Sequence, residues 1–184
     1  MRTDRLADEY GLDVVYRHFP LHPEIPPEGM DLADLFAGRE DELAAMRERL
    51  ETAMDEAGLP YGDRTRTYNS RLAQELAAWA DTRDDGRGIH DALFRAYFVD
   101  NRNLADPDVL VSVAESLGLP ADEARRVLQE RRYRDEVTRD WERARQLGLG
   151  GVPAYLADRY YVVGAQPYEV LEEMVTKAGA QRRG

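Results

Sequence analysis

The residues that could take part in acid–base or metal chemistry are few. Three histidines, His18, His22 and His90, carry the imidazole groups that titrate near neutral pH. His18 and His22 are four residues apart, but they lie in a proline-rich stretch and not on a helix, so the spacing does not align their rings. No carboxylate–histidine pattern of the metalloprotease kind accompanies them. We therefore interpret the histidines as loop and cap residues, and we expect no metal site.

The amino-acid composition of this chain excludes thiol chemistry. Its 184 residues include no cysteine, which excludes disulfides, thiolate metal sites and thiol catalysis by its own side chains. Spacing alone indicates no Ser–His–Asp or paired-carboxylate arrangement, so we predict no catalytic residue. Gly148-Leu-Gly-Gly could suggest a phosphate loop, but such loops open a helix after a strand. Here the glycines follow a predicted helix, so we interpret them as a helix end.

The bulk composition is that of an ordinary soluble protein, with 43% hydrophobic and 33% charged residues. A net charge of -11 argues against a general nucleic-acid binder, because affinity for phosphates depends on a basic surface. No apolar run approaches the roughly 20 residues of a membrane span. The segment Met1–Arg5 lacks the apolar core of a signal peptide. We expect a cytoplasmic location, with no nucleic-acid or membrane partner.

The clearest structural signal lies between residues 148 and 167. Ala154–Leu156 and Tyr160–Val163 are short runs rich in β-branched and aromatic residues, and the turn pair Asp158-Arg159 separates them. Gln166-Pro167 then leads into a terminal helix, since proline suits the first turn of a helix. The pattern predicts a β-hairpin followed by a helix.

The rest of the chain indicates one further strand and a long helical region. Leu12–Phe19 is rich in Val, Tyr and Phe and predicts a strand buried on both faces around Val14 and Val15. The four prolines between residues 18 and 29 predict a stiff, extended loop. Apolar residues at helical spacing predict five or six helices between residues 32 and 147, with a polar loop at 61–68.

These elements resemble a known family. Val152-Pro153 before a hairpin, followed by Val-Gly-Ala-Gln-Pro and an amphipathic helix, resembles the C-terminal half of the DsbA-like branch of the thioredoxin fold. The phrase Phe19–Pro26 is similar to a segment of the FrnE-type and hydroxychromene-carboxylate isomerase branches, and Asn69-Ser70 resembles part of the family's insertion. The resemblance implies an α/β fold: a thioredoxin-like core formed by residues 1–31 and 148–184, with a large all-helical insertion at 32–147.

The resemblance also implies a chemistry that this chain cannot supply. The family's thiol–disulfide exchange uses a Cys-x-x-Cys motif between the first strand and the first helix, and the resemblance places the start of this chain just after that point. We expect a family member that is redox-inactive in this cysteine-free form. One alternative is a non-catalytic peptide-binding or dimerisation module. Another is a relative of glutathione-dependent isomerases or transferases whose catalytic serine lies upstream of the given start.

Site residues follow from the same resemblance. Val152 and Pro153 would form a cis peptide bond, and Val152 would offer its backbone N–H and C=O to a thiol peptide or to glutathione, the one cofactor that the family suggests. Asn69 would stand near the bound thiol, although a helix N-cap explains it as well. His22 would lie in the loop that flanks the ligand site.

A missing first strand would leave an open position in the centre of the sheet. Each buried, unsatisfied backbone group there costs about 1–3 kcal/mol. Three alternatives could fill or close this position. Leu12–Phe19 could pair directly with Ala154–Leu156, a strand from a second copy could form a homodimer, or the natural protein could begin upstream of Met1. We favour the last.

Overall fold

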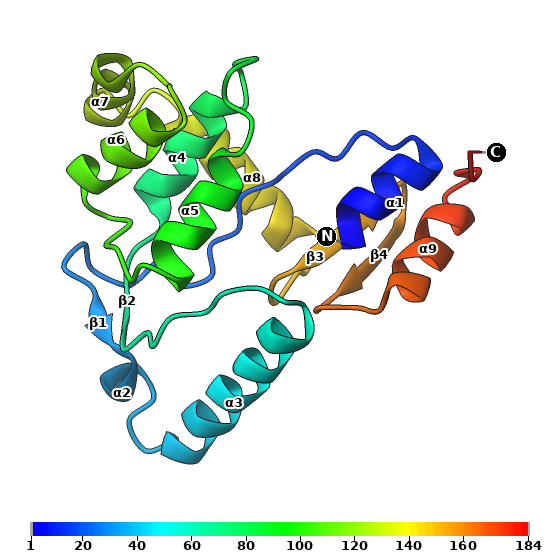
Figure 1. The fold of residues 1–184 in the computed structure, drawn as a ribbon, viewed down its shortest axis with the longest axis horizontal. Helices are drawn as coiled ribbons and strands as arrows, with labels where there is room; N and C mark the ends of the chain where they lie inside the picture. Colours follow the sequence, from blue (N-terminus) through cyan, green and yellow to red (C-terminus); the bar gives the residue numbers. More distant parts are fainter. Residues whose placement is uncertain (1, 184) are drawn as a thin grey trace. The chain divides into compact units, whose positions relative to one another are not determined.

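The computed structural model describes residues 2–183, and packing divides the chain into two units. One unit combines Met1–Leu21 with Thr138–Gly184, and the other is His22–Val137. The boundary between the units falls within helix α8 (Arg134–Gln146), drawn in yellow in Figure 1. These units are defined by packing. The proposed core and insertion, with bounds at residues 31 and 148, stay predictions.

The larger unit is mainly helical. Its helices α4 (Arg71–Ala80), α5 (Ile89–Phe98), α6 (Pro107–Ser116) and α7 (Ala121–Gln129) lie together at one end of the unit (Figure 1). They pack around a core of leucine, isoleucine, valine and alanine side chains. The most deeply buried members of this core are Leu76, Ile89, Leu110 and Val127.

Local chemistry explains where these helices begin. Asp106 caps α6, because its side chain accepts a hydrogen bond of 2.8 Å from the backbone N–H of Asp108, and Pro107 fits the first turn. The turn between α4 and α5 needs Gly86, where a Cβ atom would lie 1.9 Å from the backbone oxygen of Ala80. The Asp106 cap and the close approach at Gly86 thus explain the start of α6 and the turn before α5.

The remainder of the larger unit contains a short sheet and two further helices. Strands β1 (Met30–Asp31) and β2 (Arg66–Thr67) pair antiparallel, so the predicted polar loop at 61–68 includes a two-residue strand. Helix α2 (Leu32–Leu35) precedes α3 (Glu40–Glu56). Leu43 of α3 is buried, but Ala53 near its end and Ala57 just after it are exposed.

The smaller unit is a β-hairpin covered on one face by two helices. Strands β3 (Ala154–Ala157) and β4 (Tyr160–Val163) form the hairpin, and α1 (Arg2–Tyr10) lies beside α9 (Tyr168–Lys177) in Figure 1. Their buried core consists of Leu6, Tyr168, Leu171, Met174 and Val175. The hairpin and the terminal helix are thus present where the sequence predicts them.

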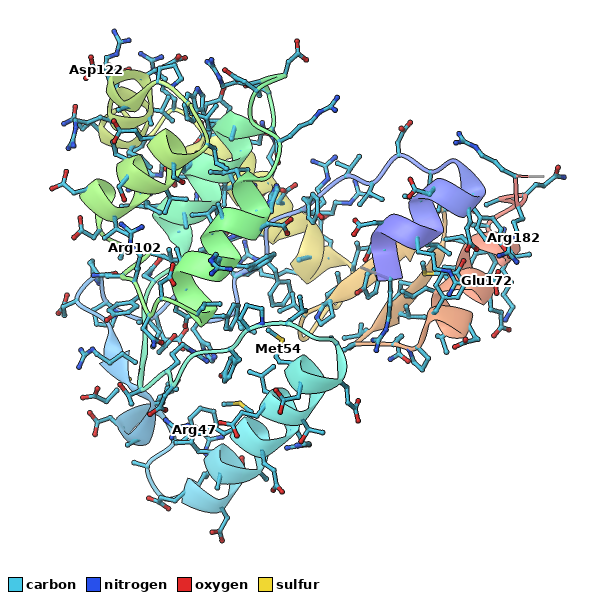
Figure 2. All side chains as sticks on the ribbon, in the orientation of Figure 1. Arg47, Met54, Arg102, Asp122, Glu172 and Arg182 are labelled. Carbon is cyan, nitrogen blue, oxygen red and sulfur yellow. The ribbon has the colours of Figure 1, made fainter. Side chains whose placement is uncertain are left out.

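Polar contacts join the two helices of the smaller unit. The Tyr168 hydroxyl donates a hydrogen bond of 2.6 Å to Glu9 Oε2, and the Tyr10 hydroxyl donates one of 2.8 Å to Glu172 Oε1. The hydrogen bond to the Glu9 carboxylate raises the pKa of Tyr168 to about 12. Arg182, labelled beside Glu172 in Figure 2, lies 3.8 Å from that carboxylate through its Nη1 atom.

The strand predicted at Leu12–Phe19 is wrong. The segment contains neither strand nor helix, and Figure 1 shows it as a loop after α1. Val14 is 45% exposed and Val15 is 65% exposed, whereas the prediction buried both. The reason is the lack of a partner, because a strand exists only as part of a hydrogen-bonded ladder. Among the described residues, β3 and β4 pair only with each other.

Candidate functional site: an open edge of the β3–β4 hairpin

The approach to the hairpin is the stretch that the sequence marks most strongly. The Val152–Pro153 peptide bond is cis, and Val152 is 48% exposed. The backbone oxygen of Pro153 accepts a hydrogen bond of 2.7 Å from the N–H of Gly164. Gly164 has a φ of 93°, in the region that glycine tolerates best, so the chain can turn here directly after β4. Pro153 and Gly164 therefore form the first hydrogen-bonded pair of the hairpin.

The Pro153–Gly164 pair determines which backbone groups of β3 point away from β4. Antiparallel pairs alternate between hydrogen-bonded and non-hydrogen-bonded residues. Because Pro153 and Gly164 form a hydrogen-bonded pair, so does Tyr155 with Val162. The residues between them, Ala154 and Leu156, direct their N–H and C=O groups to the opposite edge of β3. In the described part of the chain, no third strand lies along that edge.

Successive side chains along each strand of the hairpin point to opposite faces of the sheet. Tyr155, Ala157, Tyr160 and Val162 pack on the core formed with α1 and α9. The other face leaves large apolar side chains open to solvent, with Leu156 at 42%, Tyr161 at 58% and Val163 at 39% exposure. Large exposed apolar groups that gather on one surface indicate an interaction site more often than a single exposed residue does.

The same unit contains a second exposed apolar stretch, in the segment 12–19. Val14, Val15 and Tyr16 are all exposed. The segment is held near its end by Asp140 of α8, whose Oδ2 accepts a hydrogen bond of 3.0 Å from the backbone N–H of His18. Asp140 Oδ1 also lies 3.5 Å from Nη1 of Arg17. The pairing of Leu12–Phe19 with Ala154–Leu156, one of the three alternatives above, is absent, because β3 pairs only with β4 among the described residues.

Asn69 and His22 both lie in the larger unit, Asn69 just before α4 and His22 in the proline-rich loop. The Asn69 amide donates from Nδ2 to the backbone oxygens of Ile25 at 2.8 Å and Pro23 at 3.2 Å. Its Oδ1 accepts a hydrogen bond of 2.9 Å from the N–H of Arg71, in the manner of a helix cap. His22 Nδ1 lies 3.3 Å from Glu24 Oε1. These contacts join the proline-rich loop to the start of α4.

The third histidine and the acidic groups offer no metal site in the described residues. His90 Nε2 lies 3.0 Å from both carboxylate oxygens of Asp81, at the start of α5. Across residues 2–183, no three histidine or acidic side chains are grouped closely enough to hold a metal ion. None of the helices described for this chain is both long enough and apolar enough to cross a bilayer.

Sequence reasoning placed the candidate site at the approach to the hairpin and expected an open position beside Ala154–Leu156, but it did not say which backbone groups face that position. These are the backbone amides and carbonyls of Ala154 and Leu156, whose availability depends on the pairing register and not on side-chain type. The signal that could have found them is the two-residue turn Asp158-Arg159, because a tight turn fixes the register of a hairpin.

Comparison with known proteins gives a consistent result. The uncharacterized protein YwbO of Bacillus subtilis is 26% identical over 106 residues, and the match covers 57% of this chain and 53% of YwbO. The chain thus spans about half the length of the curated relative that it matches.

Two solved structures share the fold. A probable DsbA oxidoreductase from Streptomyces coelicolor has 32% identity and a TM-score of 0.86, covering 97% of this chain and 82% of that one. A 2-hydroxychromene-2-carboxylate isomerase has 18% identity and a TM-score of 0.69, covering 97% and 85%. The fold is therefore the helix-rich DsbA-like form of the thioredoxin fold. Residues 1–176 match the DSBA-like thioredoxin domain, and the chain belongs to that family.

Proposed function

We propose that this chain binds an extended polypeptide, such as a thiol peptide, along the open edge of β3, and that in its cysteine-free form it carries out no thiol–disulfide exchange. The observation that carries the proposal is the outward direction of the backbone groups of Ala154 and Leu156. An added strand would pair with these groups, a mode of recognition known as β-augmentation.

The exposed side chains support the same mode of binding. Backbone pairing supplies affinity without regard to sequence, while pockets for alternate side chains supply preference. Leu156, Tyr161 and Val163 form an apolar face beside the open edge. A bound segment with apolar residues at alternate positions would cover this face. Val152, directly before Pro153, would extend the pairing by the backbone contact that the family resemblance implies.

The second half of the proposal concerns redox chemistry. The family is one of thiol–disulfide oxidoreductases, in which a thiolate attacks a disulfide sulfur. This chain has no thiol to provide that thiolate. We expect no reduction of insulin disulfides by the purified chain with dithiothreitol as the electron source, beyond the rate of dithiothreitol alone. Acceleration above that rate would overturn the redox half and leave the binding half standing.

Amide hydrogen exchange tests the binding half residue by residue. Without a partner, the amides of Tyr155 and Val162 should be protected and those of Ala154 and Leu156 should exchange fast. Addition of carboxymethylated insulin B chain, an extended polypeptide without reactive thiols, should protect Ala154 and Leu156. Unchanged exchange at both positions, with the polypeptide in excess, would contradict the proposal.

A matched pair of proline variants identifies the edge. Leu156 and Tyr161 face each other in a non-hydrogen-bonded pair, so their N–H groups point to opposite edges of the hairpin. Proline lacks this N–H and is tolerated where the group faces away from the ladder. Leu156→Pro should abolish binding, whereas Tyr161→Pro should retain it. The reverse result would place the partner on β4.

Self-association is a second candidate, favoured by the exposure of Val14, Val15 and Tyr16 in a segment without a strand partner. Here the added strand would be residues 12–19 of a second copy, giving a homodimer. Sedimentation equilibrium over a wide concentration range distinguishes the two candidates. A homodimer would dissociate on dilution and be weakened by Val15→Lys, whereas a concentration-independent monomer would eliminate this candidate.

A further inference from the structure

The larger unit contains a small cavity of about 240 Å³, far along the chain from the hairpin. Its lining comes from the segment 63–68, which includes β2, and from Tyr97 and Asn101 at and after the end of α5. The cavity is near the lower limit of size for ligand pockets in proteins, which suits a small molecule or one group of a larger one. Neither the hairpin nor the family's thiol chemistry uses these residues.

The lining segment is fixed in place by contacts with the end of α5. The N–H of Gly62 donates a hydrogen bond of 2.8 Å to the backbone oxygen of Phe98. A Cβ atom at Gly62 would lie 2.3 Å from the backbone oxygen of Val99, so only glycine permits this approach. Asn101, at a φ of 54°, donates from Nδ2 to the backbone oxygen of Asp63 at 3.3 Å. Hydrogen bonds at Gly62 and at Asn101 thus hold the segment 63–68 against the end of α5, and the cavity lies between them.

Arg64 is the unusual member of the lining. Its guanidinium lies over the ring of Tyr97, 4.7 Å from the centroid. Nη1 donates to the Tyr97 hydroxyl and, at 3.4 Å, to the backbone oxygen of Arg66. Nε is buried and has no hydrogen-bond partner among the described residues. Nε and Nη2 are the two atoms from which an arginine commonly donates parallel hydrogen bonds to the two oxygens of a carboxylate.

The charges around the cavity leave Arg64 uncompensated. Arg66, the other cation of the lining, is paired with Asp31 at 2.9 Å and also donates to the backbone oxygen of Glu28. No carboxylate within residues 2–183 lies within ion-pair distance of Arg64. Asp63 also lines the cavity, and its backbone oxygen is the group that Asn101 holds.

We infer that this cavity binds the carboxylate of a small organic acid, held by the Nε and Nη2 edge of Arg64. Because Nε is buried, the Arg64 side chain has to turn this atom toward the cavity. A carboxylate there would supply the acceptor that Nε lacks, and the planar fork of the guanidinium matches its geometry. A carboxylate is favoured over a phosphate by charge. With Arg66 paired to Asp31, and with Asp63 in the lining, the cavity offers one positive charge and an unfavourable setting for a dianion.

An NMR titration tests the inference directly. Sodium benzoate, sodium acetate and sodium phosphate would be added to the full chain up to about 50 mM, with sodium chloride at matched ionic strength as the reference. We expect saturable shifts of the Arg64 Nε–H signal and of the Tyr97 and Asn101 amides with the two carboxylates. Absence of any shift beyond the sodium chloride reference would overturn the site. Tighter binding of phosphate would overturn its assignment to carboxylates.

Variants of one position give the second readout. Arg64→Gln removes the charge and the fork, and it should weaken benzoate binding by at least about tenfold. Arg64→Lys keeps the charge but loses the fork, and it should weaken binding by an intermediate factor. Arg125→Gln, on the exposed surface of α7, is the matched control and should bind like the parent chain. Equal binding by Arg64→Gln and the parent would contradict the inference, and the Nε–H signal of the parent remains decisive if that variant does not fold.

Discussion

Arg131 donates two hydrogen bonds to the carboxylate of Glu75, from Nε to Oε2 and from Nη2 to Oε1, each 2.7 Å long. Glu75 is fully buried on α4, and Arg71 donates a third bond of 2.8 Å to Oε1. Burial by itself raises the pKa of the Glu75 carboxyl. The hydrogen bonds from the two guanidiniums outweigh that effect and hold this pKa below its ordinary value. The carboxylate thus ties α4 to the turn that follows α7.

Removal of Arg131 should therefore destabilise the larger unit. Arg131 has a φ of 51°, so asparagine is the suitable replacement, because it tolerates this left-handed conformation. Arg131→Asn should lower the free energy of unfolding by about 2–4 kcal/mol, since it leaves a buried carboxylate with one cation instead of two. Urea unfolding measures the change. The control is Arg132→Asn, whose exposed pair with Glu130 should contribute about 0–1 kcal/mol. Equal losses in both variants would contradict this account.

Tyr168 predicts how stability changes at alkaline pH. A free tyrosine titrates near pH 10, and the hydrogen bond to Glu9 raises the pKa of Tyr168 to about 12. The folded state therefore holds its proton more tightly than the unfolded state. The stability from this bond is complete below about pH 10 and is lost as the pH rises from about 10 to about 12. Tyr168→Phe should be less stable at neutral pH but lose less stability over that window. Thermal unfolding measures both effects, and Tyr161→Phe, at an exposed position, should behave like the parent.

Val15 distinguishes the predicted strand from the observed loop. A valine buried on both faces of a sheet would lose roughly 2 kcal/mol or more on truncation to alanine. The side chain is instead 65% exposed, so Val15→Ala should change the free energy of unfolding by less than about 0.5 kcal/mol. The matched control is Leu171→Ala, which truncates a side chain only 1% exposed in the same unit and should cost about 2–5 kcal/mol. A large loss for Val15→Ala would mean that the segment is buried in a folded or associated form.

Asn69 tests the cap against the thiol-contact role. Its side chain serves three backbone groups, so Asn69→Ala should lower the free energy of unfolding by about 1–3 kcal/mol. Asn69→Asp keeps the acceptor for Arg71 but loses the two donations to the proline-rich loop, and it should fall between Asn69→Ala and the parent. Exchange of the Arg71 amide reports the cap separately. Unchanged stability in Asn69→Ala, combined with lost glutathione binding, would favour the ligand role instead.

Local signals in the sequence were sufficient for the hairpin and most helices. Asp158-Arg159 between two β-rich runs predicts the hairpin, and Asp106-Pro107 predicts the start of α6, because turns and caps depend on adjacent residues. The strand prediction for residues 12–19 was wrong for the opposite reason. Its composition favours a strand, but strand formation depends on a partner elsewhere, and the described chain provides none.

The candidate sites were less accessible to sequence reasoning. Val152 and Pro153 were identified from a family resemblance, whereas the open backbone groups of Ala154 and Leu156 emerge only from the pairing register. The cavity at Arg64 gave no sequence signal at all. It requires that a loop residue and Tyr97, thirty-three positions apart along the chain, meet through the packing of α5.

The open face of the hairpin also predicts an unusual response to electrolytes. Each copy carries a net charge of -11, so two copies repel one another at low ionic strength. Added salt shortens the Debye length to about 10 Å at 0.1 M and screens this repulsion, while the attraction between Leu156, Tyr161 and Val163 of neighbouring copies is unaffected. Salting the solution should therefore lower the solubility of the chain, and a single charged replacement on that face should restore it.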